Sequence, residues 1–172
     1  MLVKVNELND KEQRLLMDLY EDGNIKNASY FYPDIEDIEV GKKKVEENFI
    51  DYIKNEFLIN DGNIYYVWEE NGIWISAMRV YKINKKLYYI EALATHPKYR
   101  RQGFAEKLMS SVIEELKVQG SFEMKSMTSK ENIASQRTHE KCGFNKKYGR
   151  AFCYTSNEWV EDIVDLSYSS VV

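Results

Sequence analysis

The stretch HPKYRRQGFAEKLM, residues 96–109, separates two runs of different periodicity. The run before it, LYYIEALAT (87–95), has the apolar and aromatic composition of a β-strand. The run after it repeats apolar residues at helical spacing: Phe104, Leu108, Val112 and Leu116. Because strands and helices have these two periods, we expect a strand, a turn and a helix in this order.

The turn is expected to bind a negatively charged group. A helix N-terminus carries unpaired N–H groups and a partial positive charge, and both suit a phosphate. Gly103 would let the backbone approach closely, and Arg100 and Arg101 add charge that suits a diphosphate. The alternative is that Gly103 only permits the turn and that both arginines are solvated. The strand–turn–helix context favours the phosphate site.

The N-terminal third of the chain predicts one strand and two helices. LVKVNEL (2–8) is expected to be a strand, and residues 10–23 a helix capped by Asp10 and ended by Gly23. A second helical region lies within residues 29–57. Its apolar residues recur every three or four positions: Val45, Phe49, Tyr52, Ile53 and Phe57.

The middle of the chain predicts an antiparallel meander. The runs 63–70 and 73–83 are expected to pair through Asn71-Gly72, which is a strong hairpin signal because both residues accept positive φ. The strand 87–95 follows after a short turn and completes the meander.

Downstream of the central helix, the sequence predicts a strand at 121–128 and a short helix at 132–142, closed by Gly143. Two further strands are expected at 145–156 and 160–168. The predicted order is β-α-α-β-β-β-α-β-α-β-β. This order indicates an α/β (α+β) fold around one mixed, mostly antiparallel sheet.

Composition excludes several classes of protein. The chain has 172 residues, of which 44% are hydrophobic and 30% charged, and its net charge is −4. We therefore expect a single globular domain, 1–172, without a preference for nucleic acid. No apolar run approaches the roughly 20 residues that span a bilayer, and the first residues lack the apolar segment of a signal peptide. A cytoplasmic protein with no membrane partner is therefore expected.

The chain has few residues that bind metals or form disulfides. Its cysteines, Cys142 and Cys153, form no CxxC pair, so reduced thiols in the core are expected. With only His96 and His139 besides, no pattern of zinc ligands appears, and we expect no metal.

Two motifs resemble one protein family. Arg100, Gly103 and Ala105 match (R/Q)-x-x-G-x-(G/A), the acetyl-CoA signature of the GNAT N-acetyltransferases. NIASQRTHEKCGF (132–144) resembles the N-x-A…Y-E-K-x-G-F helix of the same family, at the same spacing. The predicted order of elements is also similar to that of the family. The resemblance therefore implies a GNAT-like fold, with helices on both faces of the sheet, and acetyl-CoA as the cosubstrate.

The resemblance also implies which residues bind CoA. Backbone N–H groups at Arg101–Glu106 would bind the pyrophosphate, and the backbone of Leu93–Thr95 would pair with the pantetheine arm where this strand splays from its neighbour at a bulge. Asn132 and Ser135 would face the arm. The implied set is Leu93, Ala94, Thr95, Arg100, Arg101, Gln102, Gly103, Phe104, Ala105, Glu106, Asn132 and Ser135.

One residue departs from the family pattern. Family members usually have a tyrosine, the proton donor, seven residues after the asparagine, whereas this chain has His139. A neutral imidazole carries one N–H, and about a quarter of an unperturbed imidazole is protonated at pH 7. We expect His139 to protonate the CoA thiolate or to relay a proton through water. The alternative is that His139 only packs near the thiol. His96, in the turn, is expected to be structural.

Glu91 is the candidate general base. Strand alternation places its side chain on the same face as Leu93, two residues further on, and a carboxylate among apolar neighbours would suit a base. The alternatives are a salt bridge at the rim of the site, or an ordered water as the base. A backbone N–H near Leu93 or Ala94 would stabilise the tetrahedral oxyanion, by analogy with the family.

The acceptor is the least defined part of the site. In the family, the first two helices and their connection, together with the region of the last two strands, usually shape the acceptor pocket. Here they carry aromatic and acidic residues: Tyr30, Phe31, Tyr32, Asp34, Glu36, Asp37 and Glu39. Aromatic walls with carboxylates would suit a cationic amine, although acidic residues at a helix start also stabilise the helix dipole, and we favour this second explanation for them.

The leading interpretation is an acetyl-CoA-dependent N-acetyltransferase that acts on the primary amine of a small molecule, such as a polyamine or an amino compound. The first alternative is a protein acetyltransferase acting on a lysine or an N-terminal amine. The second is a non-catalytic acyl-CoA-binding regulatory module. The sequence leaves the oligomeric state open, with a homodimer as one alternative.

Overall fold

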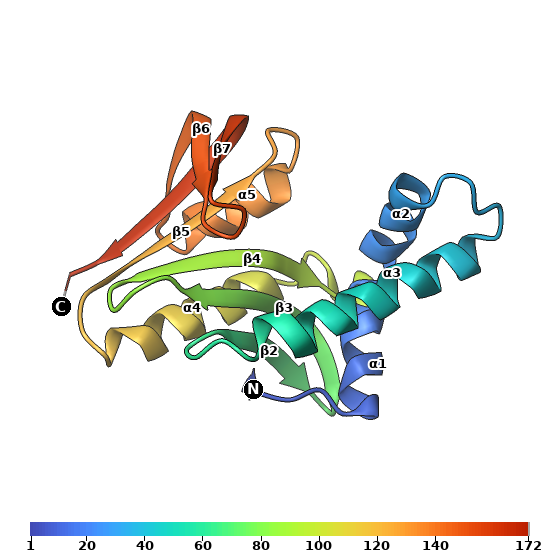
Figure 1. Cartoon of the computed structure of the whole chain (residues 1–172). Helices are drawn as coiled ribbons and strands as arrows, with labels where there is room; N and C mark the ends of the chain where they lie inside the picture. The colour runs from blue at the N-terminus through green and yellow to red at the C-terminus, as the bar shows by residue number, and fades with distance from the viewer. Residues whose placement is uncertain (172) are drawn as a thin grey trace.

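The computed structural model describes residues 1–171 and contains a seven-stranded sheet with the order β1-β2-β3-β4-β5-β7-β6 (Figure 1). Only β4 and β5 pair in parallel, so the predicted mixed, mostly antiparallel sheet is confirmed. The strands are β1 (Leu2–Val5), β2 (Ile64–Glu70), β3 (Ile73–Lys82), β4 (Leu87–Thr95), β5 (Phe122–Thr128), β6 (Asn145–Cys153) and β7 (Glu158–Ser170).

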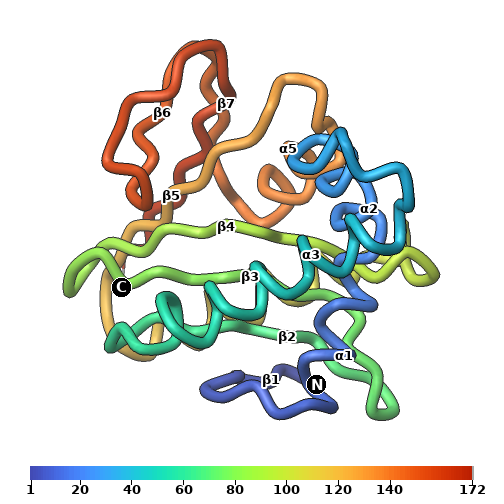
Figure 2. The backbone as a smooth tube through the Cα atoms, turned by 45° about the vertical axis from the view of Figure 1, so that its right-hand side comes forward, coloured from blue at the N-terminus to red at the C-terminus, as the bar shows by residue number. Residues whose placement is uncertain are grey.

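Helices cover both faces of this sheet, as expected (Figure 2). They are α1 (Asp10–Leu19), α2 (Glu21–Phe31), α3 (Ile38–Tyr52), α4 (Phe104–Lys117) and α5 (Ile133–Lys141). Adjacent residues of β2 show how the faces divide. Tyr65 packs with α1 in one core, and Tyr66 packs with α4 in the other, because successive side chains of a strand point to opposite faces.

The hairpin between β2 and β3 forms at the predicted turn. Asn71 and Gly72 have φ angles of 52° and 75°, which are the left-handed values that a two-residue hairpin turn requires. The predicted end of α5 is also present. The Gly143 N–H donates to the Glu140 carbonyl, and Gly143 has a φ of 90°, as in a glycine-capped helix end.

The N-terminal region contains one more helix than predicted. The first helix ends at Leu19 rather than at Gly23, and Gly23 lies inside α2. Tyr20 is the last residue of one helix and the first of the next, because its backbone leaves the helical conformation (φ −95°, ψ 9°) and its carbonyl accepts the Asn24 N–H. Tertiary contacts hold Tyr20 at this bend, as described below.

Within residues 1–171, no helix is both long enough and apolar enough to cross a membrane. The α2 helix packs against α3, and together they extend beyond one end of the sheet (Figure 1). This pair of helices forms one wall of the cavity that is described in the next section.

Candidate active site

The central feature of the site is a bulge in β4 at Ala92. In the pairing of β3 with β4, one residue of β3 opposes two residues of β4, Ala92 and Leu93. Ala92 has a φ of 53°, which is uncommon for a residue other than glycine. As a result, Glu91 faces a cavity, while Leu93 packs against the core beneath α4. The expectation that Glu91 and Leu93 share a face is therefore wrong, because strand alternation does not continue through the left-handed residue.

The strands β4 and β5 separate next to this bulge (Figure 1). They pair only over Leu87–Tyr89 and Glu123–Lys125, and a bond from the Ser126 hydroxyl to the Ile90 carbonyl, at 3.2 Å, lies just beyond the last pair. From there to Thr95, no strand within residues 1–171 pairs with β4 on its β5 side. The splay that the family resemblance implied is therefore present, and it leaves room for an extended ligand beside β4.

The turn before α4 has the backbone shape of an anion site. Gly103 has a φ of 80° and Arg101 a φ of 61°, so two left-handed residues turn the N–H groups of the loop. The first intrahelical bond of α4 runs from the Lys107 N–H to the Gly103 carbonyl, so the preceding N–H groups have no partner within the helix. Apart from the two residues next to it in the chain, no atom of residues 1–171 lies within 4 Å of a methyl group added to Gly103, so the space on that side of the turn is open.

The two arginines of this turn differ in their contacts. Arg100 forms an ion pair with Asp22 of α2, with 2.6 Å between Nη1 and Oδ2, and its Nε donates to the Thr95 carbonyl at 3.3 Å. It thereby ties the turn to α2. Arg101 is exposed and makes no ion pair within residues 1–171. His96 accepts the Lys98 N–H through Nδ1, a structural role that agrees with its expected one.

A cavity of about 630 Å³ lies beside the bulge. Its walls come from the start of α2, from α3, from β3 and β4, and from the turn between β6 and β7. The lining residues are Tyr20, Gly23, Asn24, Asn27, Val45, Phe49, Tyr52, Arg79, Glu91, Ala92, Thr155 and Ser156.

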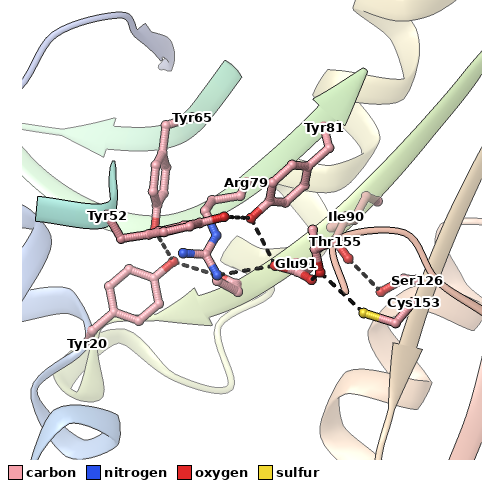
Figure 3. Close-up of polar contacts among 11 residues, drawn as sticks. Tyr20, Tyr52, Tyr65, Arg79, Tyr81, Ile90, Glu91, Ser126, Cys153 and Thr155 are labelled. Atoms are coloured by element: carbon pink, nitrogen blue, oxygen red, sulfur yellow. Dashed lines mark hydrogen bonds and ion pairs between the residues drawn. The ribbon is translucent and has the colours of Figure 1, made fainter. Parts of the chain in front are cut away.

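Glu91 is held in this cavity by three donors (Figure 3). The Tyr81 hydroxyl donates to Oε2 at 2.9 Å, and the Thr155 hydroxyl donates to Oε1 at 2.6 Å. Arg79 also reaches Oε2, at 3.4 Å from Nη2. These contacts come from β3 and from the β6–β7 turn, and they fix the carboxylate at the wall of the cavity.

Two tyrosines support the bulge: Tyr20, at the bend between α1 and α2, and Tyr65 of β2 (Figure 3). The Tyr20 hydroxyl donates to the carbonyl of Ala92, and the Tyr65 hydroxyl donates to Tyr20 at 2.7 Å. Burial raises the pKa of Tyr20 to about 12, so this phenol remains protonated and keeps its donor role at neutral pH. The bend at Tyr20 and the bulge at Ala92 therefore stabilise each other across 72 residues of sequence.

His139 is buried in α5 and does not line this cavity. Its Nδ1 lies 2.8 Å from the Ser135 carbonyl, which can only accept, so Nδ1 carries the proton of the neutral ring. Nε2 is buried and has no hydrogen-bond partner among residues 1–171. Burial lowers the pKa of His139, because the charged form loses its hydration. The neutral ring therefore presents an acceptor, not a donor, at Nε2.

Asn132 and the aromatic residues at the end of α2 have other surroundings than the sequence led us to expect. Asn132 caps α5, since its Oδ1 accepts the Ser135 N–H at 3.1 Å, so its side chain has a structural task. Tyr30 and Phe31 are 79% and 62% exposed at the end of α2 and do not line the cavity, so these two rings do not form the aromatic wall considered for a cationic amine. The aromatic rings in the cavity belong to Tyr20, Phe49 and Tyr52 instead.

Both cysteines are free thiols. Burial acts to raise the pKa of Cys153, but hydrogen bonds with Ser156, Thr155 and Tyr89 outweigh it and lower the pKa to about 7. Burial raises the pKa of Cys142. The Sγ of Cys153 lies 3.2 Å from the Oγ1 of Thr155, at the edge of the site. No group of three side chains suited to a metal occurs in residues 1–171.

Two residues of the site, Arg79 and Thr155, were not predicted from the sequence. Arg79 is the one charged residue inside the apolar strand 73–81, which is a signal of a functional or paired cation. The resemblance implied that the region of the last two strands helps to shape the acceptor pocket, but no pattern singled out Thr155. It lies 64 residues from Glu91, and only the return of β6 and β7 to the sheet brings it near.

Comparison with known proteins agrees with this architecture. The model of the acetyltransferase (GNAT) family matches residues 14–144. Among curated proteins, no sequence gives a significant match.

Three solved structures show the same fold. The ribosomal-protein-S18-alanine N-acetyltransferase of Escherichia coli has a TM-score of 0.63 and 17% identity, over 100% of this chain and 96% of that one. The PaiA N-acetyltransferase of Thermoplasma acidophilum, in complex with coenzyme A, has a TM-score of 0.64 and 12% identity, over 99% of each chain. A mutant of the SpeG spermidine N-acetyltransferase of Vibrio cholerae has a TM-score of 0.62 and 15% identity, over 98% of this chain and 92% of that one.

The bulged and splayed β4, the glycine turn before α4 and the Asn-capped α5 occur in the order expected of one family, and the family model covers well over half of the chain. The chain belongs to the GNAT family of acetyltransferases.

Proposed function

We propose that this protein transfers an acetyl group from acetyl-CoA to the primary amine of a small molecule. The observation that carries the proposal is the position of Glu91: its carboxylate lines a 630 Å³ cavity beside the β4 bulge, where β4 leaves β5. An amine in the cavity and a thioester beside β4 would meet at this point. The overall reaction forms an amide bond, breaks the carbon–sulfur bond, and leaves CoA thiol and one proton.

The residues present fit acetyl-CoA, which would supply the activated acetyl group. The open space in front of Gly103 admits a phosphate, and the N–H groups of Arg101–Glu106 would hold the diphosphate, helped by the charge of Arg101. The free side of β4 at Leu93–Thr95 would pair with an extended pantetheine arm. A backbone N–H near Leu93 or Ala94 would stabilise the oxyanion.

Glu91 is proposed to remove a proton from the acceptor ammonium, directly or through one water. An ammonium of pKa around 10 must lose a proton before its nitrogen can attack. Glu91 is 24% exposed as a side chain, and it is fixed by Tyr81 and Thr155, so it is placed to accept a proton without reorganisation.

The test of this function is the release of CoA from acetyl-CoA in the presence of a panel of primary amines. The panel should contain amino acids, amino-acid amides, spermidine and a lysine peptide, with CoA and the acetylated product quantified by chromatography. We expect product with at least one small amine. Binding of CoA without product from any amine would contradict the proposal and favour the non-catalytic acyl-CoA-binding alternative. Acetylation of the peptide alone would favour a protein acetyltransferase.

His139 is proposed as the proton donor to the CoA thiolate, and its surroundings give this role a pH dependence. Because Nδ1–H donates to the Ser135 carbonyl, the neutral ring has no proton on Nε2. Only the imidazolium can donate a proton from Nε2. Because burial lowers the pKa of His139, the imidazolium fraction falls as pH rises through and above that lowered value. We expect H139Y to turn over as fast as the wild type, or faster, at pH 8, because a phenol keeps its proton to a pKa near 10.

The matched variant is H139F, which has no donor. We expect its kcat to be lower than that of the wild type by at least about tenfold, in line with the loss of a general acid. The acid role fails if H139F stays within about twofold of wild type with an unchanged pH profile. In that case His139 only packs on Phe144, whose ring lies edge-on at 4.9 Å.

A further inference from the structure

The acceptor cavity contains a fixed, largely buried guanidinium. Arg79 of β3 lines the cavity, and its side chain is 13% exposed. The ring centroids of Phe49 and Tyr52 from α3 lie 5.5 Å and 5.2 Å from the guanidinium carbon, and these contacts hold the plane of the group. Figure 3 shows the Tyr52 ring beside Arg79. A guanidinium fixed in this way is preorganised to bind a planar anion with little loss of entropy.

Most of the hydrogen-bonding capacity of Arg79 is unused. A guanidinium has five N–H donors, and the single bond that Arg79 makes within residues 1–171 runs from Nη2 to Glu91, at a long 3.4 Å. Its Nε is buried and unpartnered. A buried donor without a partner destabilises the folded state. A ligand with acceptor oxygens could therefore bind the N–H groups of Arg79 that have no acceptor within residues 1–171.

Glu91 does not depend on Arg79 for its contacts. Its Oε1 accepts from Thr155 at 2.6 Å and its Oε2 from Tyr81 at 2.9 Å, and both bonds are shorter than the contact with Arg79. The carboxylate and the guanidinium therefore lie side by side as two separately supported charges. They are not a closed, bidentate ion pair.

The charge of the cavity argues against a polyamine acceptor. Of the lining residues, only Arg79 and Glu91 are charged at neutral pH; the others are tyrosines, amides, hydroxyls and apolar side chains. A polyamine carries at least two ammonium groups, and its second charge would find no carboxylate in this lining and would lie near a cation. A ligand with one positive and one negative group complements the adjacent negative and positive groups of the wall.

We propose that the acceptor is an amino acid, with its ammonium group at Glu91 and its carboxylate on Arg79. The inference rests on the proposed function and names the substrate class of the same site. The cavity of about 630 Å³ is larger than an α-amino-carboxylate group needs, so it also accommodates a side chain. Arg79 is a specificity residue in this account: it binds the acceptor and takes no part in proton transfer.

The experiment compares amino acids with their carboxamides at saturating acetyl-CoA. The two members of each pair share the amine and side chain and differ in the carboxylate alone, and the carboxamide also resembles a peptide N-terminus. We expect kcat/KM to be at least about tenfold higher for the best amino acid than for its carboxamide, with most of the difference in KM. Spermidine should be poorer than that amino acid.

Variants of Arg79 separate recognition from a structural effect. R79Q should reduce the preference for carboxylate over carboxamide to about twofold or less, mainly by raising KM for the amino acid, whereas R79K, which keeps the charge, should retain part of it. The control is R14Q, a surface arginine of α1 outside this cavity, which should keep the wild-type preference. If R79Q does not fold, R79K and the wild-type substrate pairs still provide the comparison.

The results of these experiments can contradict the amino-acid acceptor without contradicting the acetyltransferase function. Acetylation of carboxamides or spermidine as efficiently as amino acids by the wild type would overturn the amino-acid inference and leave the acetyltransferase function intact. An equal loss for both members of each pair in R79Q would also overturn it, because it would indicate a structural role. The absence of acetylated product with every amine would contradict the proposed function as well.

Discussion

Replacement of Glu91 by glutamine is expected to lower kcat/KM for the amine acceptor by about 100-fold or more, the range typical of a lost general base. The amide is isosteric with the carboxylate and still accepts a hydrogen bond from Tyr81 or from Thr155, so the wall of the cavity should persist. It has no basicity with which to take the proton of the ammonium group. The measurement is steady-state kinetics across pH, together with the dissociation constant of CoA.

The control for this variant is E123Q, which removes an exposed carboxylate from β5, outside the cavity. It should leave kcat/KM and its pH dependence unchanged. For E91Q, we expect the pH–rate profile to change shape while CoA affinity stays close to that of wild type. An E91Q enzyme with wild-type rates and an unaltered pH profile would remove Glu91 as the base and point to an ordered water.

Substitution of Gly103 by alanine is expected to weaken CoA binding by at least about tenfold. The added methyl group would project into the open space in front of the turn, where a diphosphate must approach the N–H groups of α4. The left-handed φ of 80° adds a backbone cost of about 1–2 kcal/mol to the folded state. Isothermal titration calorimetry with CoA measures the first effect, and thermal unfolding measures the second.

Gly72 offers a matched control for the backbone cost. It has a φ of 75° and no atom within 4 Å of an added methyl group, as at Gly103, but it lies in the β2–β3 hairpin. G72A and G103A should therefore lose similar thermal stability, and only G103A should lose CoA affinity. If G103A binds CoA as tightly as G72A does, the turn before α4 is not the diphosphate site.

The sequence determined the parts of the protein that depend on local interactions. The period of apolar residues placed α4, Asn71-Gly72 placed a hairpin, and Gly143 ended α5, because backbone conformation and one buried face decide each of them within a few residues. The two motifs were sufficient to assign the family that the family model then showed. The sequence also singled out Glu91, whose carboxylate lines the cavity, although the expected shared face with Leu93 was wrong.

Only the tertiary structure decided the shape of the proposed acceptor site. Ala92 has a left-handed backbone conformation although it is not a glycine, so the sequence does not mark this position. The hydroxyl of Tyr20, at the bend between α1 and α2, donates to the Ala92 carbonyl and stabilises this conformation. The guanidinium of Arg79 and the hydroxyl of Thr155 meet Glu91 from a neighbouring strand and from a turn 64 residues away. Such contacts depend on strand register and on the packing of distant segments, which local sequence patterns do not encode. The residues proposed to bind acetyl-CoA can thus be recognised from sequence motifs, whereas the residues proposed to bind the acceptor come together only in the folded chain.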